Sequence, residues 1–446
     1  MAKREDKRPI HFAAIGYEPM RMKPVHFATG FFLSIRERSY RLELLNKMVC
    51  HSSNRKGLQG DYTHERMYEM LQENDLISSE ISEGDLKILR MQLNGVVDND
   101  DAVFPAFRPY SEFGVDYTVL SDRLLFDSKS HRKDGYAGHF IHQILSNSSE
   151  GQFIIEFAKK CISTHETPLE RLIEPLLEKE DDAIDWQNPY QNVFGELSND
   201  RINEITRLME RETKSIKILC NNLEGFASHE TKLRGLVIAL CSWLFIYDIK
   251  VSNFGKNTHL LLMDFLGGKN NRIRASSQNS FSLQREKFYQ SYLNLRELGT
   301  LDFEDSIFIK SAKKSVDFSF LDDHFLDLAV RIGFAQPRAM QVRRKHFELQ
   351  PDTARILLMS VIPKNEIVPF DQVALDLRDV WGICIGSCPD DQNLLQNHGF
   401  IGLDHDTDLE PNTSAFIELL KKLNLAIEPS DGLVLCAPNP EDLLCL

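Results

Sequence analysis

The sequence predicts a mainly α-helical, multi-domain protein with a small β element and a winged-helix-like C-terminal module. Apolar residues recur at helical spacing along most of the 446 residues, whereas β-type patterns are short and confined to two places. The composition, 42% hydrophobic and 26% charged, is that of a chain with well-filled cores. A chain of this length is expected to form two or three domains.

Changes in composition divide the chain into four predicted segments. Residues 1–56 form a basic N-terminal arm with a first helix, and residues 57–185 form an N-terminal domain of helices with some β structure. Residues 186–350 form a helical middle domain with a basic end, and residues 351–446 form the winged-helix-like domain. An acidic run that ends at Asp182 is typical of a solvated loop, which places the second boundary near residue 185.

In the N-terminal half, apolar spacing predicts a series of helices and one hairpin. The helices are expected over 30–50, after Asp61, from Asp85 to about 93, from Gly151 onward and over about 169–177. Residues 115–129 are rich in β-forming side chains on both sides of a Ser-Asp pair, a pattern that predicts a β-hairpin.

The middle segment is expected to hold a helix that is buried on every side. Residues 202–223 predict one long amphipathic helix that Gly225 ends. The apolar run over 236–247 is shorter than the roughly 20 residues of a membrane span, so it predicts a core helix and no membrane partner. Ser228 is its expected cap, a loop is expected over 267–274, and a further helix over 283–298.

The last segment has the order of a winged helix. Helices are expected to open at Asp352, at Pro369 and at Pro411, and a hairpin is expected to turn over 429–432. Three helices followed by a hairpin are typical of winged-helix modules, which often bind DNA through the third helix. Whether this segment is expected to bind DNA or a protein therefore depends on its charge.

Charge is distributed unevenly along the chain. The net charge is −14, which excludes non-specific coating of nucleic acid and leaves only local contacts. Residues 1–56 carry 12 Lys/Arg and 5 Asp/Glu, a net of +7, which favours a basic arm with a partner or a solvated tail. Residues 389–446 carry 11 acidic and 2 basic residues, a net of −9, so this module is expected to dock a protein.

Two sets of charged residues are the predicted binding residues. The stretch 329–347 contains five basic and no acidic residues. It is interpreted either as a phosphate-contact surface or as an ordinary solvated face. The predicted nucleic-acid contacts are Arg338, Arg343, Arg344, Lys345, Arg272 and Arg274. The predicted partner contacts, on the acidic lead into the third C-terminal helix, are Asp404, Asp406 and Asp408.

The C-terminal quarter resembles a class of bacterial proteins. After the basic stretch and a helix come the sequence WGICIGSCPDD over 381–391 and then a helix that ends LKKLNLAIEPSDGL over 420–433. This order resembles the C-terminal regions of accessory, non-ATPase subunits of bacterial anti-phage and DNA-restriction systems. The resemblance implies a partner ATPase, helicase or nuclease and a role in antiviral defence, and it assigns no functional residue.

Motifs for the common enzyme classes are missing from the sequence. Gly255 and Lys256 lack the glycine-rich loop of a P-loop, and neither a Gly-x-Ser-x-Gly nor a His-Glu-x-x-His sequence occurs. No cofactor is therefore expected. Eight scattered cysteines suit a reducing, cytoplasmic location. The pair Cys384 and Cys388 is interpreted as buried thiols rather than zinc ligands, and His139 and His142 as structural residues.

One set of residues supports an enzyme as the alternative. Asp116, Asp127 and Lys129 flank the predicted hairpin in the order that metal-dependent nucleases of the restriction type use to hold Mg²⁺. A glutamate of an earlier helix, Glu65, Glu69 or Glu73, could add a ligand. The leading expectation is a non-catalytic adaptor of a DNA-defence complex. The alternatives are a nuclease subunit and a winged-helix transcriptional regulator.

Overall fold

The computed structural model describes about half of the chain, mostly in its C-terminal part. The described residues are 16–17, 27–28, 31–32, 34–35, 136–163, 197–226, 229–253, 260–297, 319–337, 344–400, 402–429 and 432–443. These residues are mostly helical, which confirms the predicted class. The expected hairpin over 115–129, the helices after Asp61, after Asp85 and over 169–177, the boundary near residue 185 and the cap Ser228 lie outside them.

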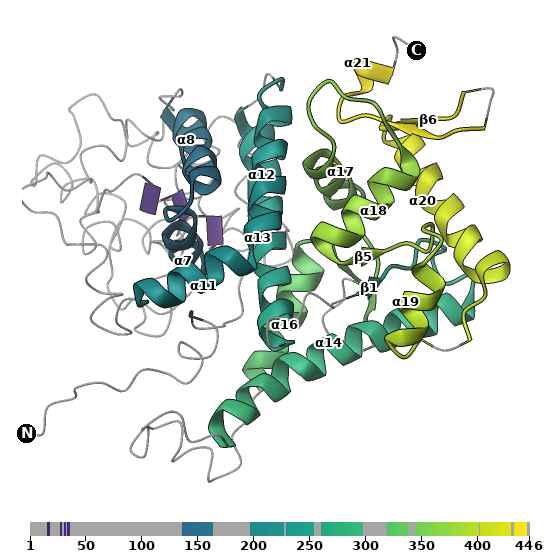
Figure 1. Cartoon of the computed structure of the whole chain (residues 1–446), viewed down its shortest axis with the longest axis horizontal. Helices are drawn as coiled ribbons and strands as arrows, with labels where there is room; N and C mark the ends of the chain where they lie inside the picture. Colours follow the sequence, from purple (N-terminus) through teal and green to yellow (C-terminus); the bar gives the residue numbers. More distant parts are fainter. Residues whose placement is uncertain are drawn as a thin grey trace, which may run out of the picture.

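A helix enclosed by the rest of the protein lies at the centre of the fold. It is α13 (His229–Ser252), and every residue from Leu236 to Tyr247 is buried. Among the described residues it is the one helix long and apolar enough to cross a membrane, yet 94% of its most apolar window is buried inside the protein. The predicted core helix is therefore confirmed. Helices α7, α8, α12, α14, α16 and α17 pack around it (Figure 1).

The N-terminal residues pack on one side of this helix. Helices α7 (Tyr136–Leu145) and α8 (Ser149–Ser163) contact α13 and each other, and Phe31 and Phe32 are helical and buried, as expected. A fully buried polar group crosses the interface. The hydroxyl of Tyr17 donates to both carboxylate oxygens of Asp248 at 2.7 and 2.9 Å and lies 3.0 Å from Nε2 of His324. Three distant segments are thereby joined at one point.

The helix expected over 202–223 is broken, which corrects the prediction. α11 (Asn199–Leu208) and α12 (Glu210–Leu223) are separated by Met209, whose backbone leaves the helical region. The break frees the carbonyl of Leu208, which accepts a hydrogen bond at 3.1 Å from Nζ of Lys250. The same ammonium lies 2.5 Å from a carboxylate oxygen of Glu212, and both side chains are buried. A buried cation thus stabilises the broken form.

The helix expected over 283–298 begins twelve residues earlier, at the start of α14 (Asn271–Glu297). Its first turn is capped, because Oδ1 of Asn270 accepts the backbone N–H groups of Arg272 and Ile273 at 2.9 and 3.2 Å. The predicted loop therefore ends at Asn270. After α14 come α16 (Ser319–Arg331) and two short antiparallel strands, β2 (Ala335–Gln336) and β3 (His346–Phe347).

The three helices and the hairpin expected at the C-terminal end are present. The elements are α17 (Pro351–Val361), β4 (Val368–Pro369), α18 (Phe370–Trp381), α20 (Glu410–Lys422), β6 (Ala426–Ile427) and β7 (Leu435–Cys436). The hairpin pairs β6 with β7, and the unpredicted strand β4 pairs with the other edge of β7. The sheet order is therefore β4-β7-β6. A short helix, α21 (Pro440–Leu443), follows the sheet.

An insertion between α18 and α20 joins this end to the middle of the chain. It contains β5 (Ile383–Cys384), α19 (Asp391–Asn397) and a π-helical turn, η5 (His405–Leu409). β5 pairs in parallel with β1 (Leu261–Leu262), a strand of the middle segment. One hydrophobic core contains Ile154, Trp243, Trp381, Phe416 and Cys436, from the N-terminal helices to the last sheet. A second, smaller core at β1, β5, α19 and η5 contains Leu262, Cys384, Leu395 and Leu409.

A buried amide cross-links α12 to the C-terminal end of α17. Nδ2 of Asn222 donates to the carbonyls of Met359 and Ile362 at 2.6 and 2.8 Å. These carbonyls lie at the end of a helix, where no further turn supplies a donor. The side chain of Asn222 is only 6% exposed, so water cannot readily replace it.

Replacing Asn222 with alanine should therefore lower the free energy of unfolding by about 2 to 4 kcal/mol, since two buried carbonyls lose their donor. The measurement is urea unfolding followed by circular dichroism. Asn221→Ala is the control, because Asn221 is adjacent and partly exposed, and its side chain forms no hydrogen bond within the described residues. Equal losses in the two variants would contradict the role given to the Asn222 amide.

Candidate functional site

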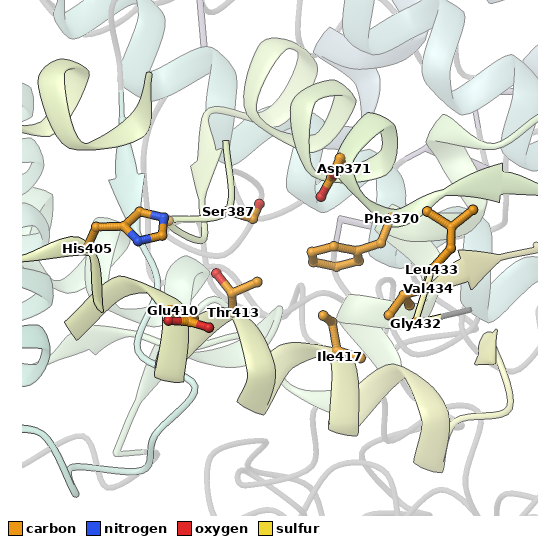
Figure 2. A pocket seen from close by; sticks show the side chains of 11 residues that line it. Phe370, Asp371, Ser387, His405, Glu410, Thr413, Ile417, Gly432, Leu433 and Val434 are labelled. Atoms are coloured by element: carbon orange, nitrogen blue, oxygen red, sulfur yellow. The ribbon is translucent and has the colours of Figure 1, made fainter. Parts of the chain in front are cut away.

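A cavity of about 260 Å³ lies beside the N-terminal half of α20. We call it the α20 pocket. Its lining comes from the start of α18, the loop after β5, the turn η5, helix α20 and the hairpin strand that leads into β7 (Figure 2). The lining residues are Phe370, Asp371, Gly386, Ser387, His405, Glu410, Thr413, Ile417, Gly432, Leu433 and Val434.

The π-helical turn η5 sets the polar end of the pocket. The N–H of Glu410 bonds to the carbonyl of His405, five residues back, as in a π-helix. This wider turn places His405 and Glu410 on the same side of the chain, and Figure 2 shows both at one end of the pocket. The ligand atoms of His405, Asp406 and Glu410 all lie within 4.8 Å of one another, and Nδ1 of His405 lies 3.0 Å from Oδ1 of Asp406.

The loop that carries Ser387 is fixed by a buried carboxylate. Oδ2 of Asp391 accepts the N–H groups of Gly386 and Cys388 at 3.2 and 3.1 Å, one on each side of Ser387. Oδ1 of Asp391 accepts from the guanidinium of Arg378 at 2.6 Å. The backbone on both sides of Ser387 is therefore fixed.

A single asparagine fixes the start of α20 against two strands. Nδ2 of Asn412 donates to the carbonyls of Met263 and Ile385 at 2.9 and 2.8 Å, and its Oδ1 accepts the N–H of Phe265 at 2.8 Å. Asn412 is fully buried. Because Met263 and Ile385 directly follow β1 and β5, the amide holds the pocket wall to the parallel strand pair.

Gly386 lets the loop pass close to η5. Its φ of +102° is strained for residues with a side chain, and a Cβ there would lie 2.8 Å from Cβ of Leu409. Any larger residue would push the loop away from the turn that carries His405. In the sequence, the glycine at position 386 is the only signal of this contact. A glycine alone does not show which residue lies next to it in the fold.

The polar side chains of the pocket are two hydroxyls, two carboxylates and the imidazole of His405. Oγ1 of Thr413 is buried and forms no hydrogen bond within the described chain, and the buried hydroxyl of Ser387 interacts with the thiol of Cys388. The carboxylates of Asp371 and Glu410 are exposed, and neither pairs with a cation that the structure describes. Carboxylates only accept hydrogen bonds, and a hydroxyl has two acceptor lone pairs. The two carboxylates give the pocket a negative charge, which a cationic group would complement.

The opposite end of the pocket is apolar. Phe370 and Ile417 form its floor, and Leu433 and Val434 of the hairpin close one side (Figure 2). Leu433 is 45% exposed, the highest exposure among the large hydrophobic residues that the structure describes. An exposed apolar side chain beside a pocket is typical of a surface that contacts a partner.

The predicted basic residues are largely engaged within the protein where they are described. Nε of Arg274 lies 2.5 Å from Oδ2 of the buried Asp264. Nζ of Lys345 donates to the carbonyl of Pro337, and Lys345 is only 1% exposed. Arg272 and Arg344 are exposed, although Arg272 lies 3.5 Å from the carboxylate of Asp408. Arg338 and Arg343 lie outside the described residues. Contact of this set with nucleic acid stays a prediction.

The predicted acidic partner contacts have different surroundings. Asp404 is exposed and accepts the N–H and the hydroxyl of Thr407 at 2.9 and 3.0 Å. Asp406 is exposed, with a side-chain accessibility of 87%. Asp408 is 2% exposed and accepts from Nδ2 of Asn270 at 2.8 Å and from the N–H of Asp404 at 2.9 Å. Of the three, Asp408 is therefore a structural residue and not part of the surface.

The residues weighed for metal or catalysis are only partly described. Cys384 and Cys388 are buried, and burial raises the pKa of the Cys388 thiol to about 11, so both are protonated near pH 7. Burial lowers the pKa of His139 and of His142 to about 4, so both imidazoles are neutral. Asp116, Asp127, Lys129, Glu65, Glu69 and Glu73 lie outside the described residues.

Comparison with protein families, with curated proteins and with solved structures returns no match for this chain. The pocket is therefore interpreted from its own chemistry. The sequence patterns did not mark Asp371, Ser387 and Thr413 as site residues.

Gly386→Ala should lower the free energy of unfolding by about 2 to 4 kcal/mol, because the new Cβ adds a steric clash to the strain of a positive φ. Gly399→Ala is the matched control. Gly399 has a φ of +89°, and a Cβ there would meet nothing within 4 Å. That variant should lose about 1 to 2 kcal/mol through strain alone. Chemical denaturation of both variants measures the difference, and equal losses would argue against the close approach to Leu409.

Proposed function

We propose that the chain is a non-catalytic adaptor subunit that docks a basic partner protein through its C-terminal end. The α20 pocket and the carboxylates around it are the proposed docking surface. The observation that carries the proposal is a surface of exposed, unpaired carboxylates next to an exposed apolar side chain, at Asp371, Glu410 and Leu433. Such a combination favours a protein surface that brings cations and apolar groups together.

The C-terminal end is proposed to be a winged-helix-like module. The support is its element order, α17, β4, α18, α20, β6 and β7, together with the three-stranded sheet in the order β4-β7-β6. In this interpretation α20 is the third helix, and the segment between β6 and β7 is the wing. The insertion with β5, α19 and η5 separates the second helix from the third.

The charge of α20 argues against nucleic acid as its ligand. Asp406 and Glu410 lie at the N-terminal end, where a recognition helix would meet base edges. Its cations, Lys421 and Lys422, lie at the other end, and Lys421 bonds to Glu418 and Glu428 at 3.0 and 2.5 Å. Bringing this surface to phosphates would cost Coulomb energy, whereas a cationic protein surface would gain it.

The wider setting of the proposal rests on the sequence resemblance. A subunit of a bacterial DNA-defence complex would leave catalysis to a partner ATPase, helicase or nuclease. Contact with DNA would then be made by other parts of the chain, such as the basic arm 1–56 and Arg338, Arg343 and Arg344.

Reversing the charge of Asp371, Asp406 and Glu410 to lysine should abolish recovery of the partner from cells that make the chain naturally. The physical reason is like-charge repulsion at the proposed interface, which costs several kcal/mol. The measurement is affinity capture of the full chain at rising salt concentrations, with quantitative mass spectrometry of what is bound. Wild-type capture should weaken with salt but persist in part, because salt does not screen apolar contacts.

The matched control reverses Asp200, Glu224 and Glu286, which are exposed on other helices and change the net charge by the same amount. It should retain the partner. Point variants are preferred to deletion of residues 351–446, because the shared core would be exposed by truncation. Loss of capture in both triple variants, or in neither, would sink the proposal, as would salt-dependent binding of duplex DNA that the first triple variant strengthens.

A further inference from the structure

We infer that the outer face of the sheet β4-β7-β6 binds an amphipathic helix of the partner protein, in which Lys or Arg residues flank an apolar stripe. The inference rests on the proposed function, because it names the kind of segment that a basic partner brings to this end of the chain. Figure 1 shows β6 at the outer end of the C-terminal part, next to α21. The two faces of this sheet have different surroundings.

The register of the strands shows which side chains share a face. One row across the sheet packs on the main hydrophobic core and consists of Val368, Cys436 and Ala426. Side chains alternate along a strand, so the next row points the other way. It consists of Pro369, Leu435 and Ile427. None of these three belongs to either hydrophobic core of the described residues.

The same face continues into exposed apolar residues. Ile367 and Leu433 lie two residues before Pro369 and Leu435, and they are 36% and 45% exposed. They are two of the three large hydrophobic residues that are exposed in the described part of the chain. We call Ile367, Pro369, Ile427, Leu433 and Leu435 the outer sheet face. A sheet face of apolar residues is normally covered by a second layer, so this face is typical of a contact surface.

The charges beside the outer sheet face indicate a basic occupant. No Lys or Arg lies within two sequence positions of its five residues, whereas four acidic residues do: Glu366, Asp371, Glu428 and Asp431. Glu428 already bonds to Lys421 at 2.5 Å, so the charge available to a partner is mainly that of Glu366 and Asp371, which are both exposed. A second copy of this face would bring like charges together, whereas cations beside an apolar stripe would gain Coulomb energy.

A helix fits this sheet better than an added strand. Strand addition needs N–H donors along a free edge, but the edge strand β4 contains Pro369, which has no N–H. The other edge strand, β6, is followed two residues later by Pro429. Three strands roughly 4.8 Å apart span about 10 Å, which matches the diameter of a helix with its side chains. The face is therefore suited to one helix that lies across all three strands.

The test is direct binding of a defined peptide to the full chain. The probe is a helical peptide of leucine and lysine with leucine along one face, and the control peptide has glutamate in place of lysine. Isoleucine δ1 methyl groups are labelled, and those of Ile367 and Ile427 are assigned with single valine variants. The lysine peptide should shift both methyls with a dissociation constant on the order of 100 μM, and the glutamate peptide should bind at least tenfold more weakly. The methyl of Ile246, which is buried in α13, should not move.

Two pairs of variants locate the binding. Ile367→Ser should weaken the lysine peptide about fivefold, because the helix loses apolar contact area. Its matched control is Leu283→Ser on α14, since Leu283 is also 36% exposed and should not matter. Glu366→Lys should weaken the lysine peptide about threefold and strengthen the glutamate peptide, with both effects reduced by salt. Glu286→Lys, an exposed position on α14, should change neither. Equal effects within either pair would overturn the inference.

Sedimentation of the chain alone tests the competing occupant. Self-association that Ile367→Ser abolishes would assign the outer sheet face to a second copy and reject the partner helix. The inference and the proposed function also fail differently, because neither Glu366 nor Ile367 lines the α20 pocket. If the lysine peptide does not shift Ile367 but partner capture still depends on Asp371, Asp406 and Glu410, docking at the pocket stands and the inference falls. If the peptide binds as expected but the triple variant retains the partner, the docking proposal falls.

Discussion

The fold depends on one constraint, which is that α13 must be covered on every side. A helix with apolar side chains all around its axis cannot lie at a surface, so the elements around it have to enclose it. Segments between residues 17 and 361 cover α13. They also supply partners for the few buried polar side chains of this helix. Asp248 meets Tyr17 and His324, and Lys250 meets Glu212. Each pair fixes the register of a covering element.

The candidate site depends on buried side chains that bond to the main chain and fix the walls of the pocket. Asn412 bonds to the main chain at the ends of β1 and β5, so the start of α20 has one position relative to both strands. Asp391 does the same for the loop that carries Ser387. The side chains that hold the walls of the pocket in place are therefore buried and bonded, whereas the carboxylates of Asp371 and Glu410 on its lining are exposed.

Local patterns in the sequence predicted those helices and strands that are determined by interactions between residues close in sequence. The core helix follows from its apolar run, and the last hairpin from its turn residues and alternating strands. The break at Met209 has a distant cause, since Lys250 stabilises it. Charge counting could not show that Arg274 is paired with Asp264 or that Asn270 and the main chain bury Asp408. The pocket joins four stretches of chain, and only the acidic flank of α20 marked it in the sequence.

The sheet order has a consequence for biosynthesis. β7 is the central strand of its sheet, although it is the last of the three to leave the ribosome. Until Cys436 has been synthesised, β4 and β6 have no common partner, and the hairpin wall of the pocket does not exist. A chain that stops before Cys436 therefore lacks the β7 side of the proposed docking surface. Under the proposed function, recruitment of a partner would be restricted to chains that have been translated past Cys436.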